Sequence, residues 1–513
     1  MNPQAVSSAS AVSSVVKSGV HHGGHRGTLR ESVAHSFAWA ALVLILAAPS
    51  CWPAGAAEKA KAAKTNLVFI LTDNQGAWML GCYGNPDIRT PNIDRLAAEG
   101  MLFTRAFASN AVCSPTRATF LSGLIPSQHG VHCFLDDKYM VGPRAYDTLA
   151  EFRTLPRILS ENGYVCGLVG KWHLGENLTP HQGFTSWITM VHGHTSEFYD
   201  MPIIENGKVR REPEYATDLW SERAVRFIRT NRDRPFFLYL AYNGPYGLGP
   251  LLLNPARNRH RDYYADKPLF SFHRDAVHPW LFNNKPYLNN PAAIRRVAAE
   301  TSGVDDGVGQ VMAALKELGL DERTLVVYAA DQGWMGGTNG IWGMGDHTRP
   351  MGAFDRMMRI PWIFRHAGSI RPGTTSDALV SNYDFLPAVL SYLNLGDKLE
   401  NALPKSPGRD FSPILRSEAI DWENVVYYEM EFVRAVRTDR WKYVHRPEGP
   451  YELYDLKNDP NEKFNLYGQP NCLAVQQELK SRLETFFDKT AERKHDLYRG
   501  GTSKATLLTG RRG

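Results

Sequence analysis

The sequence predicts an α/β fold with a large, mostly parallel, doubly wound sheet flanked by helices. After residue 64, short apolar runs alternate with segments of helical periodicity, which is typical of βαβ units. The first run, 66–71, is a candidate for a buried strand. From about residue 425 the pattern changes to short strand-like segments followed by a helix. This change predicts a small C-terminal subdomain with an antiparallel sheet packed against a helix.

The elements follow one another in a regular order. Expected strands of the large sheet are 66–71, 164–169, 235–242, 324–330 and 360–364, and expected helices are 91–100, 154–163, 218–230, 294–318 and 384–393. In the C-terminal part, strands are expected within 433–447 and 451–460, and a helix at 473–489. The stretch 248–291 is predicted to be a surface insertion. The predicted domains are a leader at 1–57, a catalytic domain at 58–424 and a subdomain at 425–513.

The N-terminus is similar to an export leader. Basic residues up to Arg30 precede an apolar run at 37–48, and Ala54-Gly-Ala56 is a candidate cleavage site. The run is short for a membrane span. We therefore expect an exported protein, periplasmic or secreted, with no stable membrane span after leader removal. A retained anchor and a lipoprotein cysteine at Cys51 are the alternatives.

The formal net charge is +5, and the leader carries +2 of it (Lys17, Arg26 and Arg30 against Glu31). The remainder is too weakly basic to indicate a nucleic-acid partner, although it is compatible with anionic substrates.

Polar side chains follow the predicted strands at their carboxyl ends. Asp73 and Asn74 follow the first strand, Lys171 and His173 the second, Tyr246 the third, and Asp331 with Gln332 the fourth. In a doubly wound sheet these ends form one rim, where ligands bind. Oxygen donors of this kind suit Ca²⁺ or Mg²⁺. A single aspartate after a strand is also common as a turn or helix-cap residue, so the joint pattern carries the inference.

The strongest local signal is Cys113-Ser-Pro-Thr-Arg117, continued by Ala118-Thr-Phe-Leu-Ser-Gly123. Pro115 favours the first turn of a helix that continues through 116–121. Cys113 would then lie just before the helix N-terminus, where backbone N–H groups favour an anion, and Arg117 could reach the same anion. Taken alone, this pattern indicates a reactive thiol of low pKa.

Several motifs together resemble the type I sulfatases of the alkaline-phosphatase superfamily. Cys113-Ser-Pro-Thr-Arg117 matches the Cys-x-Pro-x-Arg signature of that family, and Gly170-Lys-Trp-His-Leu-Gly175 is similar to its second signature. Asp73 and Asp331-Gln-Gly333 resemble its metal motifs, and Glu452-Leu-Tyr-Asp-Leu456 resembles part of its C-terminal subdomain. The likeness covers about 66–466 with the motifs in order.

The resemblance implies a specific chemistry. A formylglycine-generating enzyme would oxidise Cys113 to formylglycine (3-oxoalanine), whose hydrated form attacks the sulfur of a small-molecule or carbohydrate sulfate ester. Asp73, Asn74, Asp331 and Gln332 would hold Ca²⁺, with Mg²⁺ as the alternative, together with residue 113. Arg117 would steady the nucleophile, Lys171 would contact the sulfate and His173 the diol. Asn74 stands where the family more often has a second aspartate.

Two departures from the family pattern concern catalysis. Tyr246 follows Pro245 where the family has the histidine that partners the leaving-group oxygen, and its reference pKa near 10 makes it a different acid. Pro350 occupies the position of a usual lysine, and His347 or Arg349 is a candidate replacement. Two other functions stay open at this point. One is a phosphonate monoester or phosphodiester hydrolase of the same superfamily, and the other is a catalytically silent ligand-binding relative.

Overall fold

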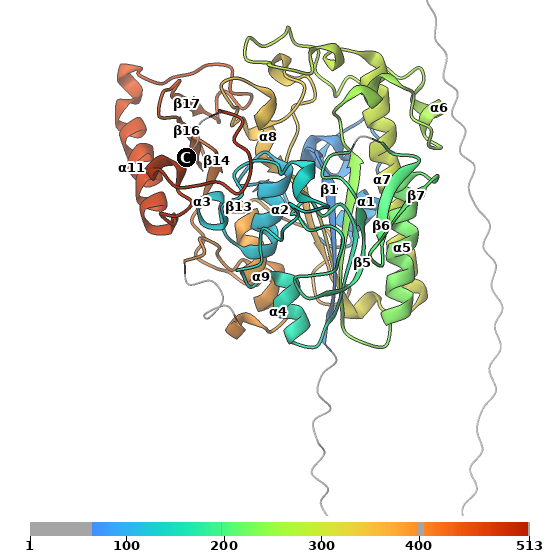
Figure 1. Cartoon of the computed structure of the whole chain (residues 1–513). Coiled ribbons are helices and arrows are strands. Elements are labelled where there is room, and N and C mark those ends of the chain that lie inside the picture. Colours follow the sequence, from blue (N-terminus) through green and yellow to red (C-terminus); the bar gives the residue numbers. More distant parts are fainter. Residues whose placement is uncertain (1–63, 196, 399–404, 511–513) are drawn as a thin grey trace, which may run out of the picture. The chain divides into compact units, whose positions relative to one another are not determined.

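The computed structural model describes residues 64–195, 197–398 and 405–510 (Figure 1). The predicted leader and Cys51 therefore lie outside the described residues, and the expectation about them stays a prediction. Among the described helices, none is both long and apolar enough to cross a membrane. The described residues belong to one compact unit. The predicted boundary at 424/425 also stays a prediction.

A ten-stranded mixed sheet forms the centre of this unit. Its strands, in spatial order, are β12 (Thr374–Ser376), β2 (Met101–Phe103), β11 (Trp362–Arg365), β9 (Thr324–Ala330), β1 (Asn66–Asp73), β8 (Phe236–Pro245), β4 (Val165–Gly170), β5 (Phe184–Met190), β6 (Met201–Glu205) and β7 (Lys208–Glu212). The five strands from β9 to β5 are mutually parallel. The predicted parallel core is confirmed, and its parallel strand ends open on one rim.

The outer strands differ from the prediction. β11, expected at 360–364, runs antiparallel to β9. The strands β5, β6 and β7 were not predicted, and β6 and β7 form an antiparallel hairpin at the edge of the sheet. The edge strand β7 is rich in charge (Lys-Val-Arg-Arg-Glu), so it lacks the apolar run that indicates a buried strand. Charged residues of this kind protect an exposed edge from pairing with another chain.

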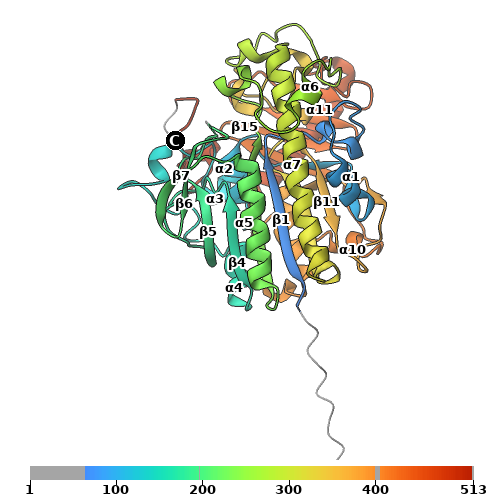
Figure 2. The same cartoon turned by 90° about the vertical axis from the view of Figure 1, so that its right-hand side faces the viewer.

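Helices cover both faces of the sheet. One face is covered by α1 (Pro91–Ala98), α5 (Ala216–Asn231) and α7 (Pro291–Glu317), as Figure 2 shows. The opposite face is covered by α2 (Cys113–Ser122), α4 (Leu155–Glu161) and α9 (Phe385–Tyr392). Alternate residues of β1 serve the two cores, since Phe69 packs with Phe120 and Phe385, whereas Ile70 belongs to the cluster of Trp220. This alternation is the period-two pattern of a strand buried on both sides.

The C-terminal part carries the predicted antiparallel sheet and helix. The sheet consists of β14 (Val425–Met430), β15 (Val433–Thr438), β16 (Trp441–His445) and β17 (Glu452–Asp455). Helix α11 (Leu473–Thr490) packs on it through Leu479, Leu483 and Phe487. A further small sheet joins β10 (Arg359–Ile360), β3 (Ala106–Phe107) and β13 (Val380–Ser381). The short helices are α3 (Pro126–His129), α6 (Arg261–Tyr264), α8 (Asp355–Met358) and α10 (Ser412–Leu415).

Candidate active site

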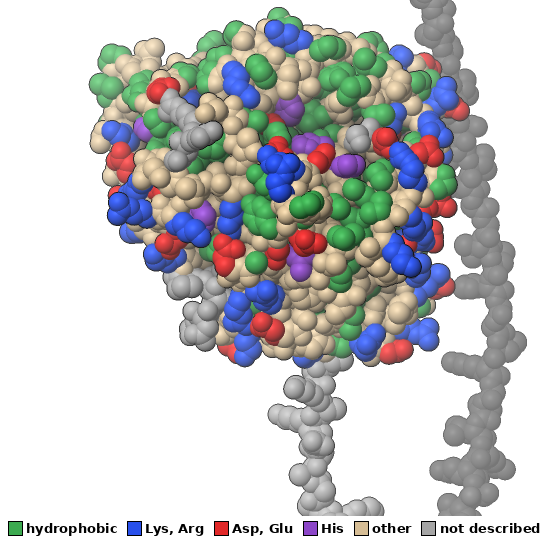
Figure 3. All heavy atoms as spheres, viewed as in Figure 1, with side chains coloured by type: hydrophobic (Ala, Val, Ile, Leu, Met, Phe, Trp, Pro, Cys, Tyr) green, Lys and Arg blue, Asp and Glu red, His purple; other side chains and the backbone are tan. Residues whose placement is uncertain are grey.

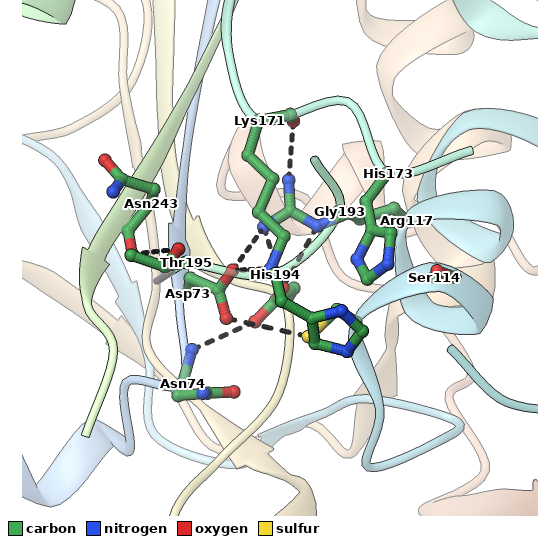
Figure 4. Close-up of polar contacts among 12 residues, drawn as sticks. Asp73, Asn74, Ser114, Arg117, Lys171, His173, Gly193, His194, Thr195 and Asn243 are labelled. Carbon is green, nitrogen blue, oxygen red and sulfur yellow. Dashed lines mark hydrogen bonds and ion pairs between the residues drawn. The ribbon is translucent and has the colours of Figure 1, made fainter. Parts of the chain in front are cut away.

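The parallel strand ends gather the predicted polar residues at one place. Asp73 is the last residue of β1, Lys171 directly follows β4, and Asp331 directly follows β9. Arg117 comes from α2 on the face of the sheet below this rim. Figure 4 shows Asp73, Arg117 and Lys171 pointing toward one another. The structure thus brings together residues that are up to 258 positions apart, which is the arrangement that the strand pattern predicts.

Two cations and two carboxylates form a buried cluster at this rim. Arg117 Nη2 lies 2.8 Å from Asp331 Oδ2 and 3.3 Å from Asp73 Oδ2. Lys171 Nζ forms a close ion pair with Asp73 Oδ2. All four side chains are fully buried. Their formal charges cancel, and each charge has an oppositely charged partner, which offsets the cost of removing it from water.

The cluster shifts the protonation of its members. Burial, with the neighbouring Asp73 carboxylate as the second cause, raises the pKa of Asp331 to about 6. Burial lowers the pKa of Lys171, but the acidic groups around it, Asp73 first, together raise it above its ordinary value. Lys171 therefore stays an ammonium ion near neutral pH, ready to bind an anion.

Asp73, Cys113 and Asp331 are suitably placed to hold a metal ion. Their donor atoms all lie within 4.8 Å of one another. Asn74 joins them, because its backbone N–H donates to Asp331 Oδ1 at 3.1 Å and its side-chain oxygen accepts a close hydrogen bond from the Gln332 amide. The Asn74 Nδ2 atom is buried without a hydrogen-bond partner. The unpaired nitrogen is a hydrogen-bond donor and does not itself indicate a cation. The carboxylate and amide oxygens gathered here do fit a hard cation such as Ca²⁺ or Mg²⁺.

Cys113 is the first residue of α2, one position further into the helix than predicted. Its Sγ lies 3.7 Å from Asp73 Oδ1 and 3.6 Å from the Gln332 amide nitrogen. Burial, followed by the repulsion of Asp73, raises the pKa of the thiol above its ordinary value. The interpretation of Cys113 as a thiol of low pKa is therefore wrong, since desolvation outweighs the helix terminus. An unmodified Cys113 is a poor nucleophile in this setting.

His173 is buried beside the cluster. Its Nε2 lies 3.1 Å from the Leu135 carbonyl, and its Nδ1 is buried without a hydrogen-bond partner. Burial lowers the pKa of His173 well below its usual value, and Lys171 lowers it further. A neutral imidazole with one free ring nitrogen can exchange a hydrogen bond with a group bound at residue 113.

Tyr246 also lies at the site. Lys171 Nζ is 5.1 Å from the centre of its ring, and the ring packs in one cluster with Cys113 and Met344. Burial raises the pKa of Tyr246 well above its ordinary value, and the nearby Cys113 and Asp73 raise it further. These surroundings make Tyr246 a weaker acid than a free tyrosine.

His347 and Arg349 lie on the loop that leads away from Met344. His347 Nδ1 is 2.7 Å from Asp346 Oδ1. Arg349 donates to the carbonyls of Asp346 and Thr348 and lies over the ring of Phe282 at 4.6 Å. Among the described residues, neither side chain contacts the buried charge cluster. Both side chains therefore lie apart from the residues that contact one another in the cluster. The expectation that His347 or Arg349 replaces the usual lysine stays a prediction.

The segment from His192 to Thr195 was missed by the sequence analysis. It follows β5, which is parallel to β4, so it reaches the same rim. The rings of His194 and His173 lie 5.1 Å apart, and Figure 4 draws His194 beside the cluster. In Figure 3, histidine, acidic and basic side chains gather near the middle of the face. The sequence His192-Gly-His194 could have indicated this part of the site, but only if the strand before it, β5, had been predicted.

The fold and the rim define an α/β protein that binds its ligand at the carboxyl ends of parallel strands, beside paired cations and a candidate metal site. The comparisons with known proteins narrow this class. The family model "Sulfatase" matches residues 65–395, and "N-sulphoglucosamine sulphohydrolase, C-terminal" matches residues 342–489. Because the first match covers more than half of the chain, the chain belongs to the sulfatase family, whose members are sulfuric ester hydrolases.

Individual relatives agree with this assignment. An N-acetylglucosamine-6-O-sulfatase of Bacteroides thetaiotaomicron is 27% identical over 86% of this chain and 90% of the relative. An ulvan-active sulfatase of Formosa agariphila is 28% identical over 82% and 80%. A protein solved with its substrate D-glucosamine-2-N,6-O-disulfate is similar in fold, with a TM-score of 0.64 and 23% identity over 83% of this chain and 98% of the other.

Proposed function

We propose that the protein hydrolyses sulfate esters of carbohydrates at the rim formed by β1, β4 and β9. The observation that carries this proposal is the buried, charge-balanced cluster of Asp73, Asp331, Arg117 and Lys171 around residue 113. A cation added to a neutral cluster makes it positive, and a sulfate group is the anion that such a site would attract. Two sulfatases that resemble the chain carry names that refer to sulfated sugars or polysaccharides.

We assign the metal to Asp73, Asn74, Asp331 and Gln332, together with residue 113, and infer that it is Ca²⁺. When bound, the metal supplies positive charge for the oxygens of the sulfate group. The side chains of the protein bind the sulfate group and position the nucleophile. Lys171 binds a sulfate oxygen, Arg117 fixes Asp73 and Asp331 in position, and His173 holds a hydroxyl of the nucleophile through its free ring nitrogen.

We infer that Cys113 is matured to formylglycine by a formylglycine-generating enzyme. The raised pKa of the thiol supports this inference, because the unmodified side chain offers little thiolate. A hydrated aldehyde carries two hydroxyl groups. One attacks sulfur, and loss of the proton from the other later expels sulfate and restores the aldehyde. We also infer that residues 1–57 direct export to the periplasm or the medium.

The alternatives are less well supported. A phosphonate monoester or phosphodiester hydrolase would be favoured by additional histidine ligands, whereas the group suited to a metal among the described residues is Asp73, Cys113 and Asp331. A silent ligand-binding relative would have no need of the free, buried Nδ1 of His173 or of the cations paired around Cys113.

The deciding experiment combines two measurements on protein co-expressed with a formylglycine-generating enzyme. Peptide mass spectrometry should find aldehyde in place of the Cys113 thiol, and sulfate release should occur from sulfated sugars and from an aryl sulfate. Cys113→Ala is the control without a nucleophile, and Cys472→Ala is the matched control at a cysteine in the C-terminal core. Release of phosphonate or phosphate but no sulfate would favour the second function, and unmodified Cys113 without turnover would favour the silent relative.

A further inference from the structure

The segment that follows β5 lies beside the end of β8 and carries a histidine. Tyr246 stands where the family has the histidine beside the leaving group, at the end of β8. The His192–Thr195 segment crosses next to this strand end, because Thr195 Oγ1 donates to the Asn243 carbonyl at 3.3 Å. Asn243 is three residues before Tyr246. The segment that carries His194 therefore packs against the end of β8 that leads to Tyr246.

His194 is held in a defined orientation at this place. Its ring makes edge contacts with Phe134 at 4.9 Å and with His173 at 5.1 Å. The Asp137 carboxylate accepts the Gly193 N–H at 3.0 Å and lies 4.0 Å from His194 Nδ1. The side chain is still 39% exposed, so a bound substrate can reach it. Figure 4 shows the imidazole next to His173.

His194 is a stronger acid than Tyr246, so its imidazolium gives up a proton more readily. Burial, followed by the ammonium group of Lys171, lowers the pKa of His194, while Asp137, Asp346 and Asp73 oppose that change. An anionic substrate bound at Lys171 would oppose it further. Burial drives the pKa of Tyr246 the other way, well above its ordinary value. Proton transfer is most efficient from an acid whose pKa is near the working pH.

We propose that His194 is the catalytic acid that protonates the leaving group, in place of a residue at position 246. The bond between sulfur and the ester oxygen breaks, and its electron pair stays on that oxygen. The N–H proton of the His194 imidazolium moves to the same oxygen, which leaves as an alcohol, and a neutral imidazole remains. The attacking hydroxyl oxygen of residue 113 takes the vacated position on sulfur, and its proton passes to the Asp73 carboxylate, whose Oδ1 lies 3.7 Å from Cys113 Sγ. This role rests on the proposed sulfatase function.

The test compares two leaving groups. An alkyl or sugar sulfate needs a proton on its leaving oxygen, whereas a nitrophenyl sulfate does not. We expect His194→Ala to lower kcat/KM by about 10²–10⁴-fold for the sugar sulfate and by less than about tenfold for the nitrophenyl ester. The matched control is His192→Ala, a neighbouring histidine whose side chain is 47% exposed and which also faces Asp137; it should leave the ratio of the two substrates unchanged.

Each other outcome has a distinct meaning. Equal losses on both substrates would mean that His194 only supports the fold of the site, which overturns the proposal. A selective loss in Tyr246→Phe instead would assign the proton to Tyr246. A wild-type enzyme that releases sulfate from neither ester would contradict the sulfatase function itself. Thermal melting of each variant separates these results from misfolding.

A second inference comes from a cavity of about 400 Å³ that is lined by other residues than the active site. Four arginines and one carboxylate line it together with aromatic side chains: Arg105, Arg356, Arg359, Arg437, Asp355, Trp78, Tyr83 and Phe107. Three of the arginines have oxygen partners. Arg105 pairs with Asp439, Arg437 with Asp355, and Arg359 donates to the Thr104 carbonyl.

Arg356 differs from these three. Its guanidinium carbon lies over the Trp78 ring, 4.2 Å from the ring centre, and its Nε is buried without a hydrogen-bond partner. No described residue accepts a hydrogen bond from this side chain. Burial, and then the neighbouring Arg359, lowers the pKa of Arg356 to about 10. Asp275 partly opposes this change. A half-buried cation beside another cation, without a hydrogen-bonded anion, is costly, and a bound anion would reduce that cost.

We infer that this cavity binds a tetrahedral oxyanion group, of the sulfate or phosphate type, through Arg356. The source of the group is either a second sulfate on the sugar substrate or a free inorganic anion. Selenate soaked into crystals of the full chain should give an anomalous peak at Arg356, and Arg356→Gln should remove that peak while the peak at the catalytic rim stays. Arg371→Gln, at an exposed arginine, is the matched control.

The kinetics then identify the source. A several-fold loss of kcat/KM for a multiply sulfated oligosaccharide in Arg356→Gln, without a loss for the nitrophenyl ester, assigns the group to the substrate. Equal activity on both substrates assigns it to a free anion. A selenate peak at the catalytic rim without one at Arg356 in the wild-type protein overturns the inference.

Discussion

Arg117 and Asp331 form a fully buried ion pair in which Nη2 lies 2.8 Å from Oδ2, although the residues are 214 positions apart in the sequence. The pair joins helix α2, which carries residue 113, to the end of β9. Arg117 also contacts Asp73 at the end of β1. One guanidinium therefore fixes the nucleophile helix to two strand ends.

Removal of that guanidinium should destabilise the protein strongly. Arg117→Met leaves Asp73 and Asp331 buried with one cation, and breaking a buried pair in this way costs about 3–5 kcal/mol. Urea unfolding should measure this loss. Added Ca²⁺ should recover part of it, because a ligand of the folded state stabilises that state. Arg371→Met is the surface control, and an Arg117→Met protein as stable as wild type would contradict the balance of charges described here.

The metal site should respond to one added charge. Asn74 supplies an amide oxygen where a carboxylate would bind a cation more tightly, so Asn74→Asp should lower the Kd for Ca²⁺ by about tenfold. Calorimetric titration checks this without any substrate. The control is Asn394→Asp, because Asn394 has a left-handed backbone (φ 58°) as Asn74 does but is exposed. Unchanged affinity in Asn74→Asp would exclude Asn74 from the metal shell.

Gly193 should be required for the position of His173. A Cβ at Gly193 would lie 2.2 Å from His173 Cδ2 and Nε2, so Gly193→Ala has to displace the imidazole. We expect a loss of about 10²-fold in kcat/KM, since small shifts of reacting groups have effects of this size. Gly396→Ala has space for the new methyl group and serves as control. Full activity in Gly193→Ala would argue against a role for His173.

Acid should unfold the protein partly through His132. Burial lowers the pKa of His132 to about 3, and its Nε2 lies 2.8 Å from the His495 carbonyl. The unfolded chain binds a proton near pH 6.5 that the folded chain binds only near pH 3, so stability present above pH 6.5 is lost as the pH falls toward 3. His132→Gln should reduce the slope of unfolding free energy against pH in this range, by up to about 1.4 kcal/mol per pH unit. His192→Gln, at a half-exposed histidine side chain, is the matched control.

Much of the fold was predictable, because the strands at its centre are buried on both faces. The run at 66–71 extends to Asp73 as β1, and the predicted 324–330 coincides with β9. The edge of the sheet was not predictable in the same way. The edge strand β7 has four charged residues among its five, so it contains no apolar run that would predict a strand. Missing β5 also hid His194, since the meaning of a polar residue depends on the strand that it follows.

The chemistry of Cys113 shows a second limit of sequence reasoning. Its position at the start of a helix was predicted within one residue, but the direction of its pKa was not. A helix terminus favours the thiolate, whereas burial beside Asp73 opposes it, and only the packed structure decides between the two effects. The positions of His347 and Arg349 were equally undecidable, because loops are not bound by strand register.

The parallel order of β5, β4 and β8 has a consequence for how such enzymes change over time. Adjacent parallel strands deliver their following residues to one edge, so these positions are nearly interchangeable in space while they are far apart in the chain. If the residue for one catalytic step is lost from the end of one strand, a residue at the end of a neighbouring strand can replace it without a change of fold. Two proteins of this architecture can therefore share a reaction and still differ in the very residue that performs one of its steps.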